Sequence, residues 1–111
     1  RYALLQLGDG TISGHRVLSA QMMAELHRPE ITVGTDWTPA ARTEDMHYAL
    51  GWFTADVRGV HIVFHNGANP GFRAAIVLAP SAKAGVVVLT NGEADQFTRA
   101  ATQSLLKQLL Q

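Results

Sequence analysis

The hydrophobic and polar positions in the first quarter of the chain predict two short helices. Ser19, a good N-cap, precedes Met22 and Leu26 at helical spacing, and Pro29 disfavours a helical residue before it. This pattern predicts a helix of about two turns. The apolar residues 1–7 stop at a turn rich in glycine, which predicts the tail of an earlier helix.

Residues 30–46 show no hydrophobic period. Small and polar residues interrupt any alternation there, among them Gly34, Thr35, Asp36 and Pro39. We therefore expect the longest irregular stretch of the chain between the short helix and the strands that follow.

The second half of the chain predicts an antiparallel sheet. β-Branched and aromatic runs alternate with glycines at short intervals, which is typical of strands joined by tight connections. Arg58-Gly59 is expected to form the first hairpin turn, and residues 80–83 the last. The four expected strands cover about residues 48–57, 60–65, 72–78 and 85–90.

Helices should cover this sheet on both faces. Residues 76–78 and 86–89 are apolar at every position, as in strands that are buried on two sides. The segment opened by Asp95 predicts a helix of about four turns. Its expected buried face consists of Phe97, Ala101, Leu105 and Leu109. The predicted class is α+β, with an antiparallel sheet of about four strands covered by helices.

Composition narrows the possible partners. Hydrophobic residues make up 47% of the chain and charged residues 16%, a balance that builds a core. Nine basic and nine acidic residues cancel without a long run of either sign, which argues against nucleic acid and anionic membranes. The chain has no cysteine, and its apolar runs fall far short of the roughly 20 residues of a membrane helix. The cellular compartment stays open.

The most informative segment for chemistry covers residues 65–72, with the sequence HNGANPGF. Glycine at a strand end lets a ligand approach the backbone, and a free N–H beside it can face an oxyanion. The alternative is a wide turn with polar side chains in solvent, because Asn, Gly and Pro are ordinary turn residues. The residues alone leave both interpretations open.

A metal site is not expected. His61 and His65 are four positions apart, and Glu44, Asp45 and His47 lie near one another in the sequence. Four residues of a strand span about 13 Å, too far for one zinc ion with ligands at about 2 Å. We predict neither a metal nor another cofactor.

Five short motifs, in this order, resemble the C-terminal part of the serine β-lactamase-like hydrolases. They are YALGWF (48–53), RG (58–59), HNGANPGF (65–72), AP (79–80) and GVVVLTN (85–91), and LGDG (7–10) before VLS (17–19) also fits. That group includes class C β-lactamases, penicillin-binding DD-peptidases and related esterases. The resemblance implies a β-lactamase/transpeptidase-like fold, of which residues 1–111 would be a single C-terminal fragment.

The resemblance also implies roles for one cluster of residues. Such hydrolases combine a Ser-x-x-Lys pair, a Tyr-x-Asn element and a Lys-Thr-Gly or His-x-Gly strand, and only the last is matched here. His65 would position or protonate the substrate, and Asn66 would contribute to substrate binding. Gly67 would leave room for the acyl chain, and the Ala68 N–H would form half of an oxyanion hole. Histidine in place of lysine is similar to the esterase and peptidase branch.

Ser104 and Lys107 formally match the Ser-x-x-Lys spacing. In the family that this chain resembles, the nucleophile begins a buried helix far upstream of the sheet strand, whereas Ser104 comes late in the last helix. We interpret this pair as part of a surface helix.

Two functions from different classes follow. The first is the C-terminal portion of a serine hydrolase that acts through an acyl-enzyme on a small ester, amide or peptide. Its nucleophile would lie outside this chain, so the chain alone should be inactive. The second is a non-catalytic module of the same architecture that binds a ligand or partner. In both cases the remaining sheet surface would contact the rest of the parent protein or a second copy.

Overall fold

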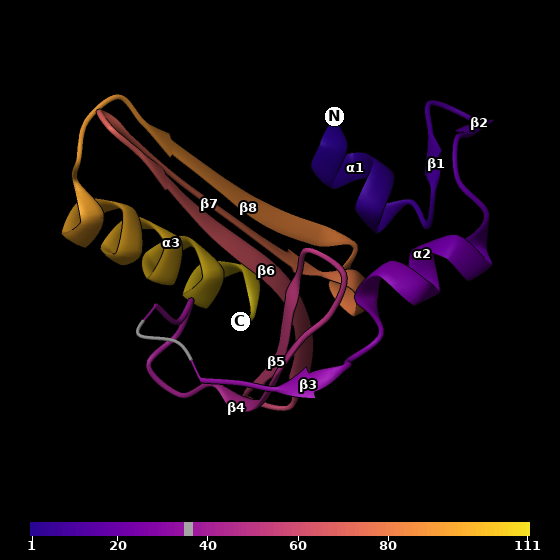
Figure 1. The fold of residues 1–111 in the computed structure, drawn as a ribbon, viewed down its shortest axis with the longest axis horizontal. Helices are drawn as coiled ribbons and strands as arrows, with labels where there is room; N and C mark the ends of the chain where they lie inside the picture. The colour runs from indigo at the N-terminus through magenta and orange to yellow at the C-terminus, as the bar shows by residue number, and fades with distance from the viewer. Residues whose placement is uncertain (35–36) are drawn as a thin grey trace.

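The computed structural model describes residues 1–34 and 37–111, so the expectation of irregular structure at Thr35 and Asp36 lies outside the described residues. Figure 1 shows the course of the chain. The helices are α1 (Tyr2–Leu7), α2 (Ala20–His27), the 3₁₀ helix η1 (Pro80–Ala82) and α3 (Asp95–Leu109). The strands are β1 (Thr11–Ile12), β2 (His15–Arg16), β3 (Ile31–Thr32), β4 (Glu44–Tyr48), β5 (Phe53–Val57), β6 (Val60–Asn69), β7 (Phe72–Ala79) and β8 (Ala84–Thr90).

Six strands form one antiparallel sheet in which each strand pairs with the next along the chain, in the order β3-β4-β5-β6-β7-β8. Strands β1 and β2 form a separate ribbon. The predicted α+β class with an antiparallel sheet and covering helices is confirmed. The expected number of about four strands was too low.

The missed strands have a physical explanation. The expected strand over residues 48–57 is two strands, because Gly51 adopts a φ of +79° and the Ala49 N–H donates to the Trp52 carbonyl at 2.7 Å. β3 and most of β4 lie in the stretch expected to be irregular. A register shift in β4, with Asp45 at a φ of +52°, breaks the alternation that would reveal a strand.

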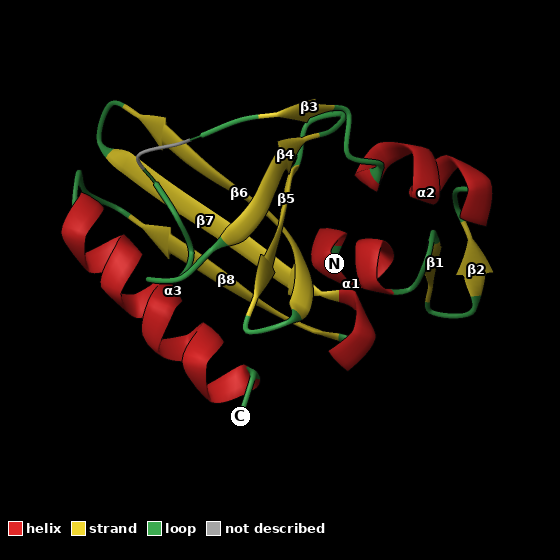
Figure 2. Ribbon diagram, turned by 90° about the horizontal axis from the view of Figure 1, so that it is seen from below, coloured by secondary structure: helices red, strands yellow, loops and turns green. Residues whose placement is uncertain are grey.

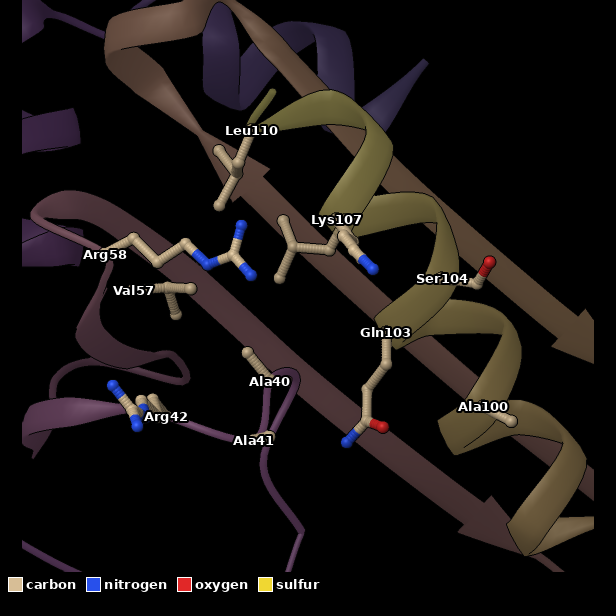
Figure 3. Close-up of a pocket in the computed structure, with 11 residues that line it drawn as sticks. Ala40, Ala41, Arg42, Val57, Arg58, Ala100, Gln103, Ser104, Lys107 and Leu110 are labelled. Atoms are coloured by element: carbon tan, nitrogen blue, oxygen red, sulfur yellow. The ribbon is translucent and has the colours of Figure 1, made fainter.

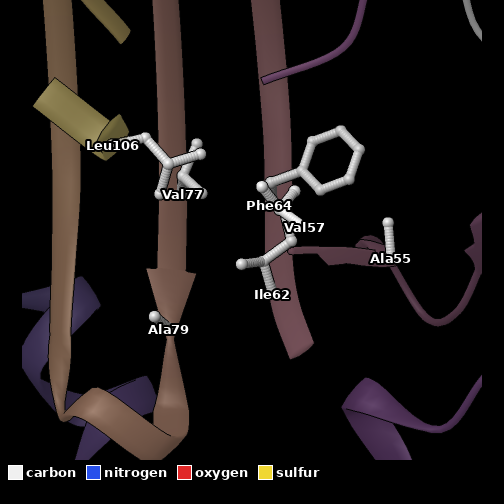
Figure 4. Close-up of a cluster of buried hydrophobic side chains, with 7 residues drawn as sticks. All are labelled: Ala55, Val57, Ile62, Phe64, Val77, Ala79 and Leu106. Carbon is white, nitrogen blue, oxygen red and sulfur yellow. The ribbon is translucent and has the colours of Figure 1, made fainter. Parts of the chain in front are cut away.

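One face of the sheet packs under α3. Figure 4 shows the buried cluster there, in which side chains from β5, β6 and β7 meet Leu106 of α3. The cluster consists of Ala55, Val57, Ile62, Phe64, Val77, Ala79 and Leu106. Fully buried aromatic and aliphatic side chains of this kind each contribute roughly 1.5–3 kcal/mol.

The predicted buried face of α3 is correct for Leu109, which is partly buried against the cluster, but wrong for Phe97 and Leu105. Phe97 is 62% exposed and Leu105 43% exposed, whereas the buried residues of the helix are Thr98, Thr102 and Leu106. Each threonine hydroxyl donates to the carbonyl four residues earlier, at 2.9 Å and 2.7 Å. That bond satisfies the hydroxyl and lets a polar side chain enter the core.

The opposite face packs against α1. Trp52, Val63 and Leu78 form its buried cluster, with Ala3 and Leu7 of α1 against them. Figure 1 shows α1 and α3 on opposite sides of β7 and β8. The expectation of two covered faces is confirmed for β7 but not for β8 in this chain.

On the α1 side, β8 remains open. Val87 is 51% exposed and Leu89 76% exposed, while Val86 and Val88 on the α3 side are buried. The neighbouring helix α1 adds Tyr2 and Leu4, also more than half exposed. We call these four residues the open apolar face.

Helix α2 and the β1–β2 ribbon lie at the end of the molecule away from α3, as Figure 2 shows. The predicted N-cap of α2 is confirmed, since the Met22 N–H donates to the Ser19 hydroxyl at 3.1 Å. Trp52 connects this end of the molecule to the sheet, because its ring stacks on Tyr2 and contacts the ring of His27 edge-on. None of the described helices is long and apolar enough to cross a membrane.

Candidate functional site

Strand β6 continues beyond His65, where the expected strand ended. Residues 65–69 pair with β7 as far as Asn69 and Phe72, so the turn itself contains only Pro70 and Gly71. Gly71 takes a φ of +80°, which glycine adopts without strain. The segment is therefore a strand with a tight hairpin, and the wide turn considered from the sequence was wrong.

One edge of this strand is open. β5 pairs with β6 only as far as Phe53 opposite Phe64, whereas β7 accompanies β6 for five further residues. Beyond Phe64, residues 65–69 thus have a neighbouring strand on one side only. Backbone groups on the other side are available to a ligand.

The direction of the backbone groups follows from the hairpin. A two-residue turn makes Asn69 and Phe72 a hydrogen-bonded pair, so alternate residues of β6 direct their N–H groups toward β7. Asn66 and Ala68 therefore direct theirs toward the open edge. The Asn66 carbonyl, which accepts from His65 Nδ1 at 2.5 Å instead of joining the ladder, agrees with this direction.

His65 is half-buried and both of its ring nitrogens are engaged. Nδ1 lies 2.5 Å from the Asn66 carbonyl oxygen and Nε2 lies 3.2 Å from the Tyr48 hydroxyl. A carbonyl only accepts, so in a neutral imidazole Nδ1 donates the proton and Nε2 accepts from Tyr48. The ring also packs against Phe53, with centroids 5.3 Å apart.

Tyr48 is a site residue that sequence reasoning missed. It was included as the first residue of an expected strand and of the motif YALGWF, without a role in the site, and it lies 17 positions before His65. Its side chain reaches His65 because β4, β5 and β6 are neighbours in the sheet. A tyrosine at the end of a strand can be assigned to the site only when the order of the strands in the sheet is known.

A groove runs from this edge across the sheet to α1. It has a volume of about 390 Å³, and its lining includes His65, Asn66 and Gly67. The rest of its lining comes from α1, β7 and β8 and consists of Arg1, Tyr2, Ala3, Ala74, Ala75, Ile76, Val87 and Leu89. Ala68 is exposed and lies outside the lining, at the open edge.

Gly67 leaves space in this groove. A Cβ at this position would meet only the Cβ of Ala74, at 3.8 Å, which is an ordinary contact. The glycine is therefore not required by the backbone, and a larger side chain here would narrow the groove.

Comparison with known proteins identifies the family of this chain. Residues 2–110 match the β-lactamase family. The chain belongs to the β-lactamase family. A second similarity is to the unguisins hydrolase ungD of Aspergillus violaceofuscus, at 46% identity over 46 residues. That match covers 41% of this chain and 8% of the relative, and no solved structure matches.

These comparisons place the chain in the family that the resemblance predicted. The matched part spans less than a tenth of the length of the curated relative. The expected β-lactamase-like fold is thereby confirmed for this chain.

In this β-lactamase-family chain, Glu93 and Asp95, just before α3 and at its first residue, bind the β6–β7 hairpin. The Gly71 N–H donates to Glu93 Oε1 at 3.0 Å, and Arg73 Nε donates to Asp95 Oδ1 at 2.6 Å. The bond to Asp95 is the main reason that the pKa of Arg73 is raised. These contacts fix the hairpin that carries Ala68 against the start of α3.

The Ser104–Lys107 pair of this β-lactamase-family chain does not meet His65. Both residues are exposed on α3, which covers the sheet face opposite the groove. The surface location agrees with our interpretation, although Leu105 does not supply the buried side of the helix.

Two other histidines, His61 and His47, have local partners. His61 Nδ1 lies 3.2 Å from Asp56 Oδ1, and His47 Nδ1 lies 3.0 Å from the Asp45 backbone oxygen. His61 and His65 both lie on β6, as the strand argument required. Within residues 1–34 and 37–111, no three His, Asp or Glu side chains gather closely enough to hold a metal ion.

Proposed function

We propose that this chain supplies the substrate-binding strand of a serine hydrolase that acts through an acyl-enzyme on a small ester, amide or peptide. The observation that carries the proposal is the open edge of β6, where the Ala68 N–H has no strand opposite it and lies three residues from His65. Membership of the β-lactamase family supports the same reaction class.

The backbone of Ala68 would stabilise the developing negative charge. A serine oxygen attacks the substrate carbonyl carbon, a new C–O bond forms, and the carbonyl oxygen becomes an oxyanion. An N–H directed at that oxygen contributes roughly 3 kcal/mol in comparable sites. When the intermediate collapses, the bond to the leaving group breaks and the leaving group takes a proton. Water then attacks the acyl carbon, the bond to the serine oxygen breaks, and the serine oxygen takes a proton from the water.

His65 would act together with Tyr48. Nε2 accepts a hydrogen bond from the Tyr48 hydroxyl, so two arrangements with a substrate follow. In the first, the hydroxyl lies between the substrate and Nε2. In the second, the hydroxyl has turned away and Nε2 contacts the substrate directly. In the first arrangement the Tyr48 hydroxyl gives its proton to the leaving group and takes the serine proton in its place. In the second, Nε2 first takes the serine proton and then gives it to the leaving group. The bond between Nδ1 and the Asn66 carbonyl holds the ring at the open edge.

The groove would accept the apolar part of the substrate. Gly67 leaves space beside the reacting edge, and Ile76 and Val87 offer an apolar wall. Acyl chains without charge fit this lining best.

The second candidate function is a non-catalytic module that binds a ligand along the same edge. The observation that favours it is the engagement of both His65 ring nitrogens within the chain. In such a module the open edge would bind an extended segment by backbone hydrogen bonds alone.

The deciding experiment uses the complete parent protein with chromogenic ester and amide substrates. His65→Ala should lower kcat/KM about a hundredfold or more if His65 takes part in proton transfer. His61→Ala, on the same strand and exposed, is the matched control and should leave the rate unchanged. An unchanged rate in His65→Ala would favour the binding module.

The chain by itself should hydrolyse neither a chromogenic ester nor a chromogenic cephalosporin above background, because none of the described residues that line the groove is a serine. Turnover that disappears in Ser104→Ala would contradict this and make Ser104 the nucleophile.

A further inference from the structure

A second cavity lies on the α3 side of the sheet. It has a volume of about 550 Å³ and is bounded by residues 40–42, the β5–β6 turn and the C-terminal half of α3. It shares no lining residue with the groove at His65. Its size falls within the roughly 300–1,000 Å³ of sites that bind small molecules.

The lining of this cavity combines an apolar floor with positive charge. Three of its residues are cations from three different segments: Arg42, Arg58 and Lys107. Figure 3 shows Arg58 extending from its turn toward α3, with Leu110 beside its guanidinium. The other lining residues are Ala40, Ala41, Val57, Ala100, Gln103, Ser104, Leu106 and Leu110.

The three charges are not neutralised by the described part of the chain. None of the lining residues is acidic, and none of the described carboxylates forms an ion pair with Arg42, Arg58 or Lys107. Three like charges around one concave apolar surface repel one another, and a bound anion removes that cost. Guanidinium groups suit carboxylate and phosphate because their paired N–H groups match two oxygens.

We propose that this cavity binds an amphipathic oxyanion, a carboxylate or phosphate head on an aliphatic body. The body would lie on Val57, Leu106 and Leu110. The head would lie between Arg42 and Arg58, because Lys107 is in the last turn of α3, where the helix carbonyls carry partial negative charge. The site does not depend on the proposed hydrolase function.

The test is calorimetric titration of the 111-residue chain with decyl phosphate and, separately, decanoate, both below their micelle concentrations. At least one should bind with a Kd of about 100 μM or tighter. The stronger of the two identifies the preferred head. Inorganic phosphate and decyltrimethylammonium should each bind at least about tenfold more weakly, because one lacks the body and the other has the wrong charge.

Variants locate the binding. Arg58→Asn suits the turn, since Asn tolerates the positive φ of this position, and should weaken binding about tenfold or more. Lys107→Gln should have a smaller effect. Lys83→Gln, which removes an exposed charge elsewhere, and Leu89→Gln, on the open apolar face, should change the Kd less than about twofold.

Several outcomes would overturn the proposal. They are equal binding of the cationic amphiphile, equal binding of inorganic phosphate, an unchanged Kd in Arg58→Asn with native circular dichroism, and loss of binding in Leu89→Gln. Should Arg58→Asn fail to fold, an Ala40→Glu variant gives the same information, because a carboxylate in the lining should abolish binding of the anion.

Discussion

At the scale of single residues, the polar groups inside this protein differ in whether they have partners. Thr98 and Thr102 are buried with their hydroxyls bonded to helix carbonyls. Thr54 on β5 is buried as well, and its hydroxyl has no partner among the described residues. Burying an unpaired hydroxyl costs free energy, whereas a bonded one costs little.

Thr54→Val should therefore raise the free energy of unfolding by about 1 kcal/mol, because it replaces the unpaired hydroxyl with a methyl group of similar shape. Thr102→Val is the matched control, since it removes a bonded hydroxyl, and it should lower the free energy of unfolding. Denaturant unfolding of both variants checks the pair. A loss of stability in Thr54→Val would mean that the hydroxyl has a partner.

His27 makes the stability depend on pH. Burial is the main reason that its pKa lies below the ordinary 6.5, the nearby His61 lowers it further, and Asp9 opposes both. The unfolded chain therefore takes up a proton near pH 6.5 that the folded chain does not. Stability is complete above pH 6.5 and falls as the pH decreases toward the folded pKa.

We predict that His27→Gln removes this part of the pH dependence between pH 7 and pH 5. The effect should be below about 1 kcal/mol, because the half-exposed ring is partly screened by solvent. His15→Gln, at an exposed position of β2, is the control and should keep the slope of the wild type. Equal slopes for His27→Gln and the wild type in guanidinium unfolding would count against the assignment.

At the scale of elements, α3 offers a direct test of which side faces the sheet. Leu106 is 2% exposed in the main cluster, while its neighbour Leu105 is 43% exposed. Leu106→Ala should lower the free energy of unfolding by about 2–5 kcal/mol through lost burial and a cavity. Leu105→Ala should cost less than about 1 kcal/mol. Similar losses for the two variants would contradict the orientation of the helix.

Most elements could be predicted from the sequence because they carry their own local signals. The Ser19 cap, Pro29 and the Arg58-Gly59 turn each act on the backbone within a few residues. Strands β3 and β4 could not be predicted, because β3 is two exposed residues long and a register shift interrupts β4. The face of α3 was misassigned because hydropathy does not reveal which threonines bond to their own helix.

The candidate site, like the fold, could be predicted from the sequence only in part. The residues from His65 to Ala68 are contiguous, so one motif in the sequence was enough to find them. Tyr48 and the walls of the groove come from other elements, and only the pairing of strands brings them together. The cavity with Arg42, Arg58 and Lys107 was not predictable for the same reason.

At the scale of the whole molecule, the open apolar face is the feature with the largest consequence for behaviour in solution. Leu89 is 76% exposed next to Val87, and both border the groove. Contiguous apolar surface of this kind favours contact with another protein surface. We expect the isolated chain to self-associate through it.

Light scattering after size exclusion should show an average mass that rises with concentration. The double variant Val87→Thr, Leu89→Lys should shift the chain toward the monomer, because it places charge on the contact surface. Leu105→Lys on the far side of the sheet is the control and should associate like the wild type. A monodisperse monomer that binds no hydrophobic dye would contradict the expectation.

The order of the six strands also has a kinetic consequence. Since every strand of the sheet pairs with its neighbour along the chain, most pairings close loops of only a few residues. A topology of such low contact order folds faster than sheets of the same size with distant pairings. The exception is α1, whose contacts with β7 and β8 join residues about 70 to 80 positions apart in the chain. Docking of α1 should therefore be the late event, and the groove at His65 would gain its second wall only after the sheet has formed.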